Sequence, residues 1–170
     1  DTGRKAGKWP LPPGNTGIRK EFNRWRCEQI TRLVRDACAI TRTLNPKAVI
    51  SAAVYGNYPA ISESIAQDWG SWLKEDLVDF VCPMDYVQNN EQFSAIVKRQ
   101  LALPMAAGRV YPGIGVTASE SRLTPVQTMD QIAIINKAGA SGFAIFDLNR
   151  VTANEVLPLL RLSSTSDTKN

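Results

Sequence analysis

Polar and aromatic side chains follow four short apolar runs of this 170-residue sequence, and they are the side chains that could do chemistry. They are Tyr55, Asn57 and Tyr58 after the first run, Asp85, Tyr86, Gln88 and Asn89 after the second, Thr117, Ser119 and Glu120 after the third, and Asp147 and Asn149 after the fourth. Aromatic rings stack on the apolar face of a pyranose, while hydroxyl, amide and carboxylate groups bond its hydroxyls. The set is therefore typical of a sugar site.

Two of these residues, Asp85 and Asp147, are candidates for a pair of carboxyl groups. Two carboxyl groups can divide the general-acid work from the nucleophile or base work of glycoside hydrolysis when about 5 to 9.5 Å separates them. The residues predicted to bind substrate are Tyr55, Asn57, Tyr86, Thr117 and Glu120. A structural alternative stays open, because Asp and Asn at loop starts are commonly helix caps or turn formers and a loop Glu is commonly a solvated residue.

The chain has no histidine, and this excludes several kinds of site. Ser-His-Asp hydrolysis, histidine metal triads and a Cys-His nucleophile at Cys82 cannot be assembled from this chain alone. The pair Gly113 and Gly115 lacks the third glycine of a dinucleotide fingerprint. We therefore predict neither a metal nor a cofactor.

The apolar runs that position these residues cover residues 48–54, 77–81, 110–116 and 142–146. Each is too short for a buried helix and too apolar for a strand with one solvated face, which favours strands buried on both faces. A helix-period stretch follows each run, and a longer helix is expected first, over residues 21–44. This order predicts an α/β fold with a parallel sheet built from four β/α units.

Helix caps are predicted where a polar residue precedes an apolar stripe. Thr124 with Gln127 forms a capping box before Pro125, and Gly139 ends that helix. The other predicted caps are Thr152 with Glu155, Asn90, and Ser62.

The length and the 44% hydrophobic content suit one domain, expected over residues 21–162, after a loop or linker at 1–20 and before a polar tail at 163–170. No apolar run is long enough to span a bilayer, and the N-terminus lacks the apolar core of a signal peptide. The net charge of +4 is spread over helix faces, so no nucleic-acid partner is expected.

Much of the chain, from about Phe22 to Leu160, resembles the carboxyl-terminal half of the bacterial glycoside-hydrolase-like family 10 proteins. The most specific part is the series of Gln, Asp, Trp, Pro and Tyr residues between Gln67 and Tyr86. The residues that carry the resemblance are Trp25-Arg26, Ile30 to Val34, Asn45-Pro46-Lys47, Val49 to Ala53, Gln67-Asp68-Trp69, Trp72, Val78-Asp79-Phe80-Val81, Pro83-Met84-Asp85-Tyr86, Gly113-Ile114-Gly115 and Gly142-Phe143-Ala144-Ile145-Phe146.

The resemblance implies that the four strands are strands five to eight of a TIM-type barrel. It also implies a glycoside hydrolase that acts on a polysaccharide, such as a bacterial cell-wall glycan, and that is exported to the periplasm, the cell surface or the medium. The family's acidic end of strand four would precede Asp1, so an upstream half is expected to supply part of the site. The resemblance makes Asp85 the first choice for a catalytic or substrate-positioning carboxyl group facing the sugar and Asp147 a second one at the rim, whereas Asp68 is expected to cap a loop.

Two alternatives stay open. A non-catalytic carbohydrate-binding module would use the same tyrosines, and a doubly wound flavodoxin-like sheet would suit a binding or regulatory domain. Four barrel strands leave two unpaired edges and an open apolar interior. We therefore expect an upstream half, or a second copy of the chain, to cover them.

Overall fold

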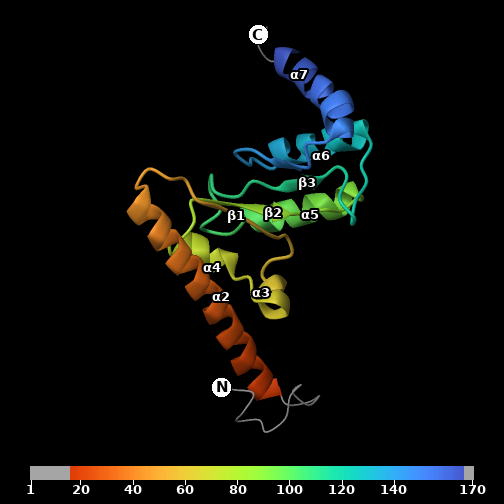
Figure 1. Cartoon of the computed structure of the whole chain (residues 1–170). Helices are drawn as coiled ribbons and strands as arrows, with labels where there is room; N and C mark the ends of the chain where they lie inside the picture. The colour runs from red at the N-terminus through yellow and green to blue at the C-terminus, as the bar shows by residue number, and fades with distance from the viewer. Residues whose placement is uncertain (1–15, 167–170) are drawn as a thin grey trace. The chain divides into compact units, whose positions relative to one another are not determined.

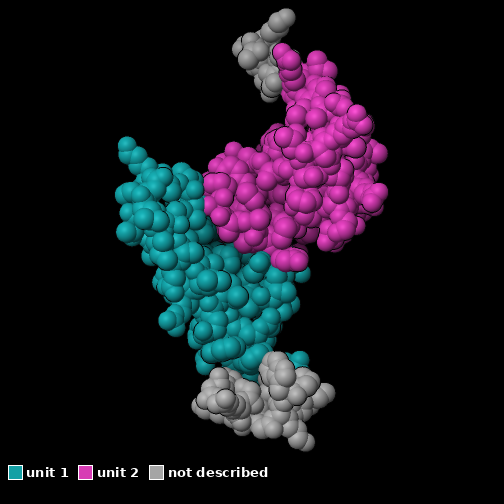
Figure 2. All heavy atoms as spheres, in the orientation of Figure 1, with its two compact units in different colours: residues 1–50, 57–79 teal, residues 51–56, 80–170 magenta. Residues whose placement is uncertain are grey.

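The computed structural model describes residues 16–166, and this part of the chain divides into two compact units (Figure 2). The first comprises residues up to 50 together with 57–79, and the second comprises 51–56 together with the residues from 80 onward. Residues 1–15 of the loop or linker predicted at 1–20, and residues 167–170 of the predicted tail, lie outside the described residues, whereas residues 16–20 are helical. Within 16–166, no helix combines the length and the apolar character needed to cross a membrane.

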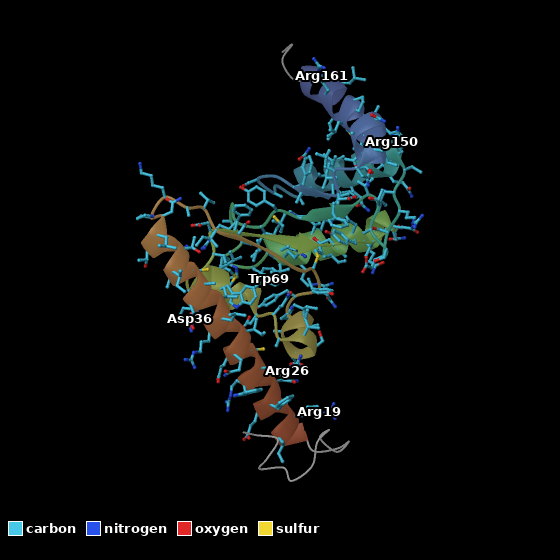
Figure 3. The ribbon with its side chains drawn as sticks, in the orientation of Figure 1. Arg19, Arg26, Asp36, Trp69, Arg150 and Arg161 are labelled. Atoms are coloured by element: carbon cyan, nitrogen blue, oxygen red, sulfur yellow. The ribbon has the colours of Figure 1, made fainter. Side chains whose placement is uncertain are left out.

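The first unit is helical. Its long helix α2 (Thr16–Leu44) begins five residues before the expected start, and side chains of α2 contact the two short helices α3 (Ala60–Ile65) and α4 (Trp69–Lys74). Figure 3 labels Arg19, Arg26 and Asp36 along α2 and Trp69 on α4.

The two short helices replace the single helix predicted after Ser62. The chain breaks at Ala66, which has a φ of 67°, and restarts at Asp68, whose carboxylate accepts the N–H of Ser71. The capping role expected for Asp68 is confirmed. Ser62 is not a cap, because it lies inside α3.

The second unit holds a four-stranded parallel sheet in the order β1-β2-β3-β4 (Figure 1). The strands are β1 (Ser51–Tyr55), β2 (Phe80–Met84), β3 (Gly113–Gly115) and β4 (Ala144–Phe146). This confirms the predicted α/β fold and parallel sheet. The strands begin two or three residues later than the apolar runs, since the first residues of each run belong to the connection that leads into its strand.

Helices α5 (Asn90–Leu101) and α6 (Pro125–Lys137) cover one face of this sheet. The capping box of Thr124 and Gln127 is present as predicted. At α5 the cap is Asn89 and not Asn90, because the side chain of Asn89 accepts the N–H of Gln92. The apolar core on this face consists of Phe93, Val97, Ile114, Val116, Leu123, Ile132, Ile135 and Val156.

The other face of the sheet carries the alternate side chains of each strand, and we call it the open face. Ser51, Ala53 and Tyr55 are exposed along β1, and Phe146 is exposed at the end of β4. Register places these residues in rows, Tyr55 beside Met84 and Gly115 beside Phe146. The open-face residues are Ser51, Ala53, Tyr55, Phe80, Cys82, Met84, Gly113, Gly115, Ala144 and Phe146.

The chain continues from β4 into a π-helical turn, η1 (Thr152–Val156), and helix α7 (Leu157–Ser166). Figure 3 labels Arg150 just before η1 and Arg161 on α7. The capping box predicted for Thr152 and Glu155 is wrong. The turn is already helical at Val151, and the hydroxyl of Thr152 donates to the carbonyl of Asp147 instead.

Candidate functional site

Four of the predicted site residues lie at the carboxyl end of the sheet, each at the end of a strand or within two residues after it. Tyr55 ends β1, Asp85 follows β2, Thr117 comes two residues after β3, and Asp147 follows β4 directly. Because the strands are parallel and adjacent in chain order, these four positions share one edge of the second unit. This is the edge where α/β sheets carry their ligands.

Short hydrogen bonds at this edge join the side chains of Thr117, Asp147 and Asn149, which we call the Asp147 cluster. The hydroxyl of Thr117 donates to Asp147 Oδ1 over 2.6 Å, and Asn149 Nδ2 donates to the same oxygen over 2.7 Å. Asn149 Nδ2 also lies 2.6 Å from the hydroxyl oxygen of Thr117. The hydrogen bond from Thr117, helped by the one from Asn149, lowers the pKa of Asp147. Asp147 is therefore an ionised carboxylate in a fixed orientation at neutral pH.

The backbone that follows β4 holds this cluster in place. Asn149 Oδ1 accepts the N–H groups of Val151 and Thr152 over 2.9 and 3.1 Å, so the structural role considered for Asn149 is present. The hydroxyl of Thr152 donates to the carbonyl oxygen of Asp147 over 2.7 Å. One amide side chain thus binds the carboxylate with its nitrogen and starts the next helix with its oxygen.

An aromatic pair lies beside the Asp147 cluster. The ring of Tyr86 stacks on that of Phe146, with 5.4 Å between centroids and 27° between planes. Phe146 precedes Asp147 in the chain and is 48% exposed. Tyr86 can lie over β3 because residue 115 is glycine, since a Cβ there would come within 2.8 Å of Tyr86 Cγ and 2.5 Å of Ser121 Oγ. The pair offers a partly exposed aromatic surface next to an oriented carboxylate.

A second carboxylate, Glu120, is exposed in the loop after β3. The hydroxyl of Ser119 donates to it over 2.7 Å and lowers its pKa. The pKa of Tyr86 is raised, first by burial and then by the negative charge of Glu120, with smaller effects from Asp85 and Asp147. The surroundings of the Tyr86 ring are therefore anionic.

Asp85 belongs to a different network. Its side chain is only 2% exposed, and Gln100 Nε2 donates to its Oδ1 over 2.7 Å. The same nitrogen donates to the carbonyl of Gly56, after β1, over 2.8 Å. Burial raises the pKa of Asp85 to about 8, opposed by the hydrogen bond from Gln100. In this structure the carboxyl group of Asp85 is not presented to solvent.

The remaining two predicted residues are placed separately. Tyr55 is 50% exposed and lies on the open face beside Met84. Asn57 is exposed and belongs to the first unit, where its carbonyl accepts the N–H of Ile61.

Two residues with a part in these networks were not among the candidates, Phe146 and Gln100, and Asn149 was a candidate without an assigned role. Gln100 carries a readable signal, because it is a polar residue on the stripe of Phe93 and Val97 that faces the core. Phe146 reads only as the end of an apolar run, and its exposure follows from the register of β4.

The chemistry available at this edge is carboxylate, hydroxyl and amide chemistry. Among residues 16–166, no three Asp, Glu, Cys or His side chains are grouped in a way that could hold a metal ion. A groove of about 640 Å³ lies between α5 and α6, but none of the residues that line it belongs to the Asp147 cluster or to the aromatic pair. The candidate site is therefore a surface at the end of the sheet.

No protein-family model, no curated protein and no solved structure matches the chain.

Proposed function

We propose that this chain is part of a glycoside hydrolase and that Asp147 is one of its catalytic carboxylates. The observation that carries the proposal is an ionised carboxylate, oriented by Thr117 and Asn149, beside the partly exposed Tyr86 and Phe146 rings. A sugar ring stacked on the aromatic pair would bring its hydroxyls and its anomeric carbon to this carboxylate. Asp147 then serves as nucleophile or as the base that activates water.

Glycoside hydrolysis also needs an acid that protonates the leaving oxygen. Glu120 does not suit this role, because its lowered pKa keeps it ionised. Burial raises the pKa of Asp85 to about 8, but its carboxyl group lies against Gln100 and is not presented to solvent. We assign the acid to an upstream half of the protein, as the family resemblance implies, and the catalytic role of Asp85 stays a prediction.

The architecture we propose is strands five to eight of a barrel. Two features support it over a doubly wound sheet: the strand order has no reversal, and the open face carries exposed residues at β1 and β4. Parallel sheets are almost always covered on both faces. In the described part of the chain, β1 and β4 are also edge strands, with no further strand paired to their outer sides. An upstream half, or a second copy, would cover both.

A non-catalytic carbohydrate-binding module is the second candidate. It is favoured by the burial of Asp85, which leaves only one of the two predicted catalytic carboxyl groups in contact with the polar surface at the strand ends. Such a module needs only the aromatic pair and the hydrogen-bonding groups of the Asp147 cluster. It would bind a glycan without cleaving it.

The test is the release of reducing ends from bacterial cell-wall glycans and from α- and β-glucans by the complete gene product that contains this chain. Turnover supports the hydrolase, whereas binding without turnover replaces it with the binding module. An Asp85→Asn variant belongs in the same assay. A loss on the order of 100 to 10,000-fold would make Asp85 a catalytic acid or base, and full activity would make its role structural.

A further inference from the structure

Asp85 and Gln100 form a buried pair that the proposed catalysis does not use. Gln100 is 0% exposed and Asp85 2% exposed. Gln100 reaches from α5 to the ends of two strands, because its Nε2 donates both to Asp85 Oδ1 and to the carbonyl of Gly56. Residue 56 must be glycine, since a Cβ there would overlap the Asp85 carboxyl group. The pair therefore joins α5 to the residues that follow β1 and β2.

Each side chain of the pair keeps one buried oxygen without a partner. Asp85 Oδ2 and Gln100 Oε1 accept no hydrogen bond from any residue in the described range. Two buried, unsatisfied acceptors are costly, and an uncompensated buried negative charge is more so. The groups found around the carboxyl are the amide of Gln100 from α5, the carbonyl of Gly56 after β1 and the adjacent phenol of Tyr86. None of them is a cation.

We propose that Asp85 is a neutral carboxylic acid in the folded protein and that its Oδ2 proton is donated to Gln100 Oε1. The proton makes Asp85 Oδ2 a hydrogen-bond donor, and Gln100 Oε1 accepts the hydrogen bond that it donates. Both oxygens that had no partner are then hydrogen-bonded. The result is a cyclic acid-amide pair with two hydrogen bonds, one in each direction. It explains both unsatisfied oxygens without any further group.

The Asp85–Gln100 pair is a pH-sensitive hydrogen-bonded contact between α5 and the strand ends. Burial raises the pKa of Asp85 to about 8 from an ordinary value near 3.8. For a carboxyl group whose folded pKa is raised, the stabilising contribution is complete below the ordinary pKa and is lost as the pH rises through the folded pKa. The contact between Asp85 and Gln100 therefore weakens toward pH 8, because ionised Asp85 has no proton on Oδ2 to donate to Gln100.

The direct test follows the side-chain carboxyl carbon of Asp85 by ¹³C NMR in the full chain as the pH is raised, with an Asp85→Asn sample to assign the signal. We expect the shift of a protonated carboxyl group at pH 6 and a transition near pH 8. A transition near pH 4 would overturn the proposal.

A second measurement compares thermal unfolding of the wild type with two variants at pH 6 and at pH 9. Asp85→Asn offers an amide donor in place of the proton, so its Tm should lie close to that of the wild type at pH 6. Its Tm should fall less than that of the wild type between pH 6 and pH 9. Gln100→Leu removes the partner and should lower the Tm at both pH values. Equal pH dependence of the wild type and Asp85→Asn would contradict the neutral acid, and the NMR titration decides the case if Gln100→Leu does not fold.

Discussion

The hydroxyl of Thr117 lies 2.6 Å from Asp147 Oδ1, although the two residues are thirty positions apart and follow different strands. Adjacent parallel strands bring them together, since β3 pairs with β4 in a register that sets Gly115 beside Phe146. The bond favours the charged form of Asp147 and fixes its direction.

Replacing Thr117 by Val should raise the pKa of Asp147, because the main hydrogen bond to its ionised form is lost. As the pH is lowered, any binding or turnover that needs the ionised carboxylate should then be lost at a higher pH in Thr117→Val than in the wild type. Titration of the Asp147 carboxyl carbon by NMR measures the change. Thr117→Ser, which keeps the hydroxyl, is the control, and an unchanged pKa in Thr117→Val would show that the bond does not set the charge.

Replacing Phe146 by Ala should weaken binding of soluble oligosaccharides by about 0.5 to 1.5 kcal/mol, or roughly 2 to 10-fold, because the stacking surface is removed. Calorimetric titration gives the affinity. Leu148→Ala changes a more exposed apolar residue two positions away and should have little effect. Equal losses in both variants would assign the effect to the loop and not to the aromatic pair.

Replacing Ala53 by Glu should disrupt association at the open face, where Ala53 is exposed on β1. A charge buried under an upstream half or a second copy is costly, whereas a charge in water is not. Light scattering of the wild-type chain should show self-association that Ala53→Glu reduces. A cooperative wild-type monomer, with the variant equally stable, would mean that nothing covers this face.

Replacing Thr124 by Ala should lower the free energy of unfolding by about 0.5 to 2 kcal/mol, because it removes the side-chain oxygen that accepts the N–H of Gln127 at the start of α6. Denaturant unfolding measures the loss. Thr43→Ala removes an exposed hydroxyl that bonds within α2, so it should change stability little. A similar loss in both variants would show that the cap is not the cause.

Local signals predicted the elements better than the contacts of the site. The start of α6 follows from Thr124, Gln127 and Pro125, which act within one turn of helix. The cap of α5 was misplaced by one residue because Asn89 and Asn90 are equally good caps by type, and only the helix start distinguishes them.

Contacts between distant residues could not be read in the same way. The pairing of Asp85 with Gln100 depends on the direction in which α5 returns along the sheet, and no motif encodes it. The position of Asp147 at a strand end was readable from the fourth apolar run, but its two hydrogen bonds depend on the register between β3 and β4. Sequence therefore identified the edge of the sheet and most of its polar residues, and the structure shows which of them are in contact.

The most direct test of the proposed function is the turnover of an Asp147→Asn variant of the complete gene product. Asn keeps the size of the side chain but removes the charge and the ability to attack or to accept a proton. We expect reducing-end release from the susceptible glycan to fall on the order of 100 to 10,000-fold with thermal stability nearly unchanged. Full turnover in this variant would contradict the catalytic assignment of Asp147.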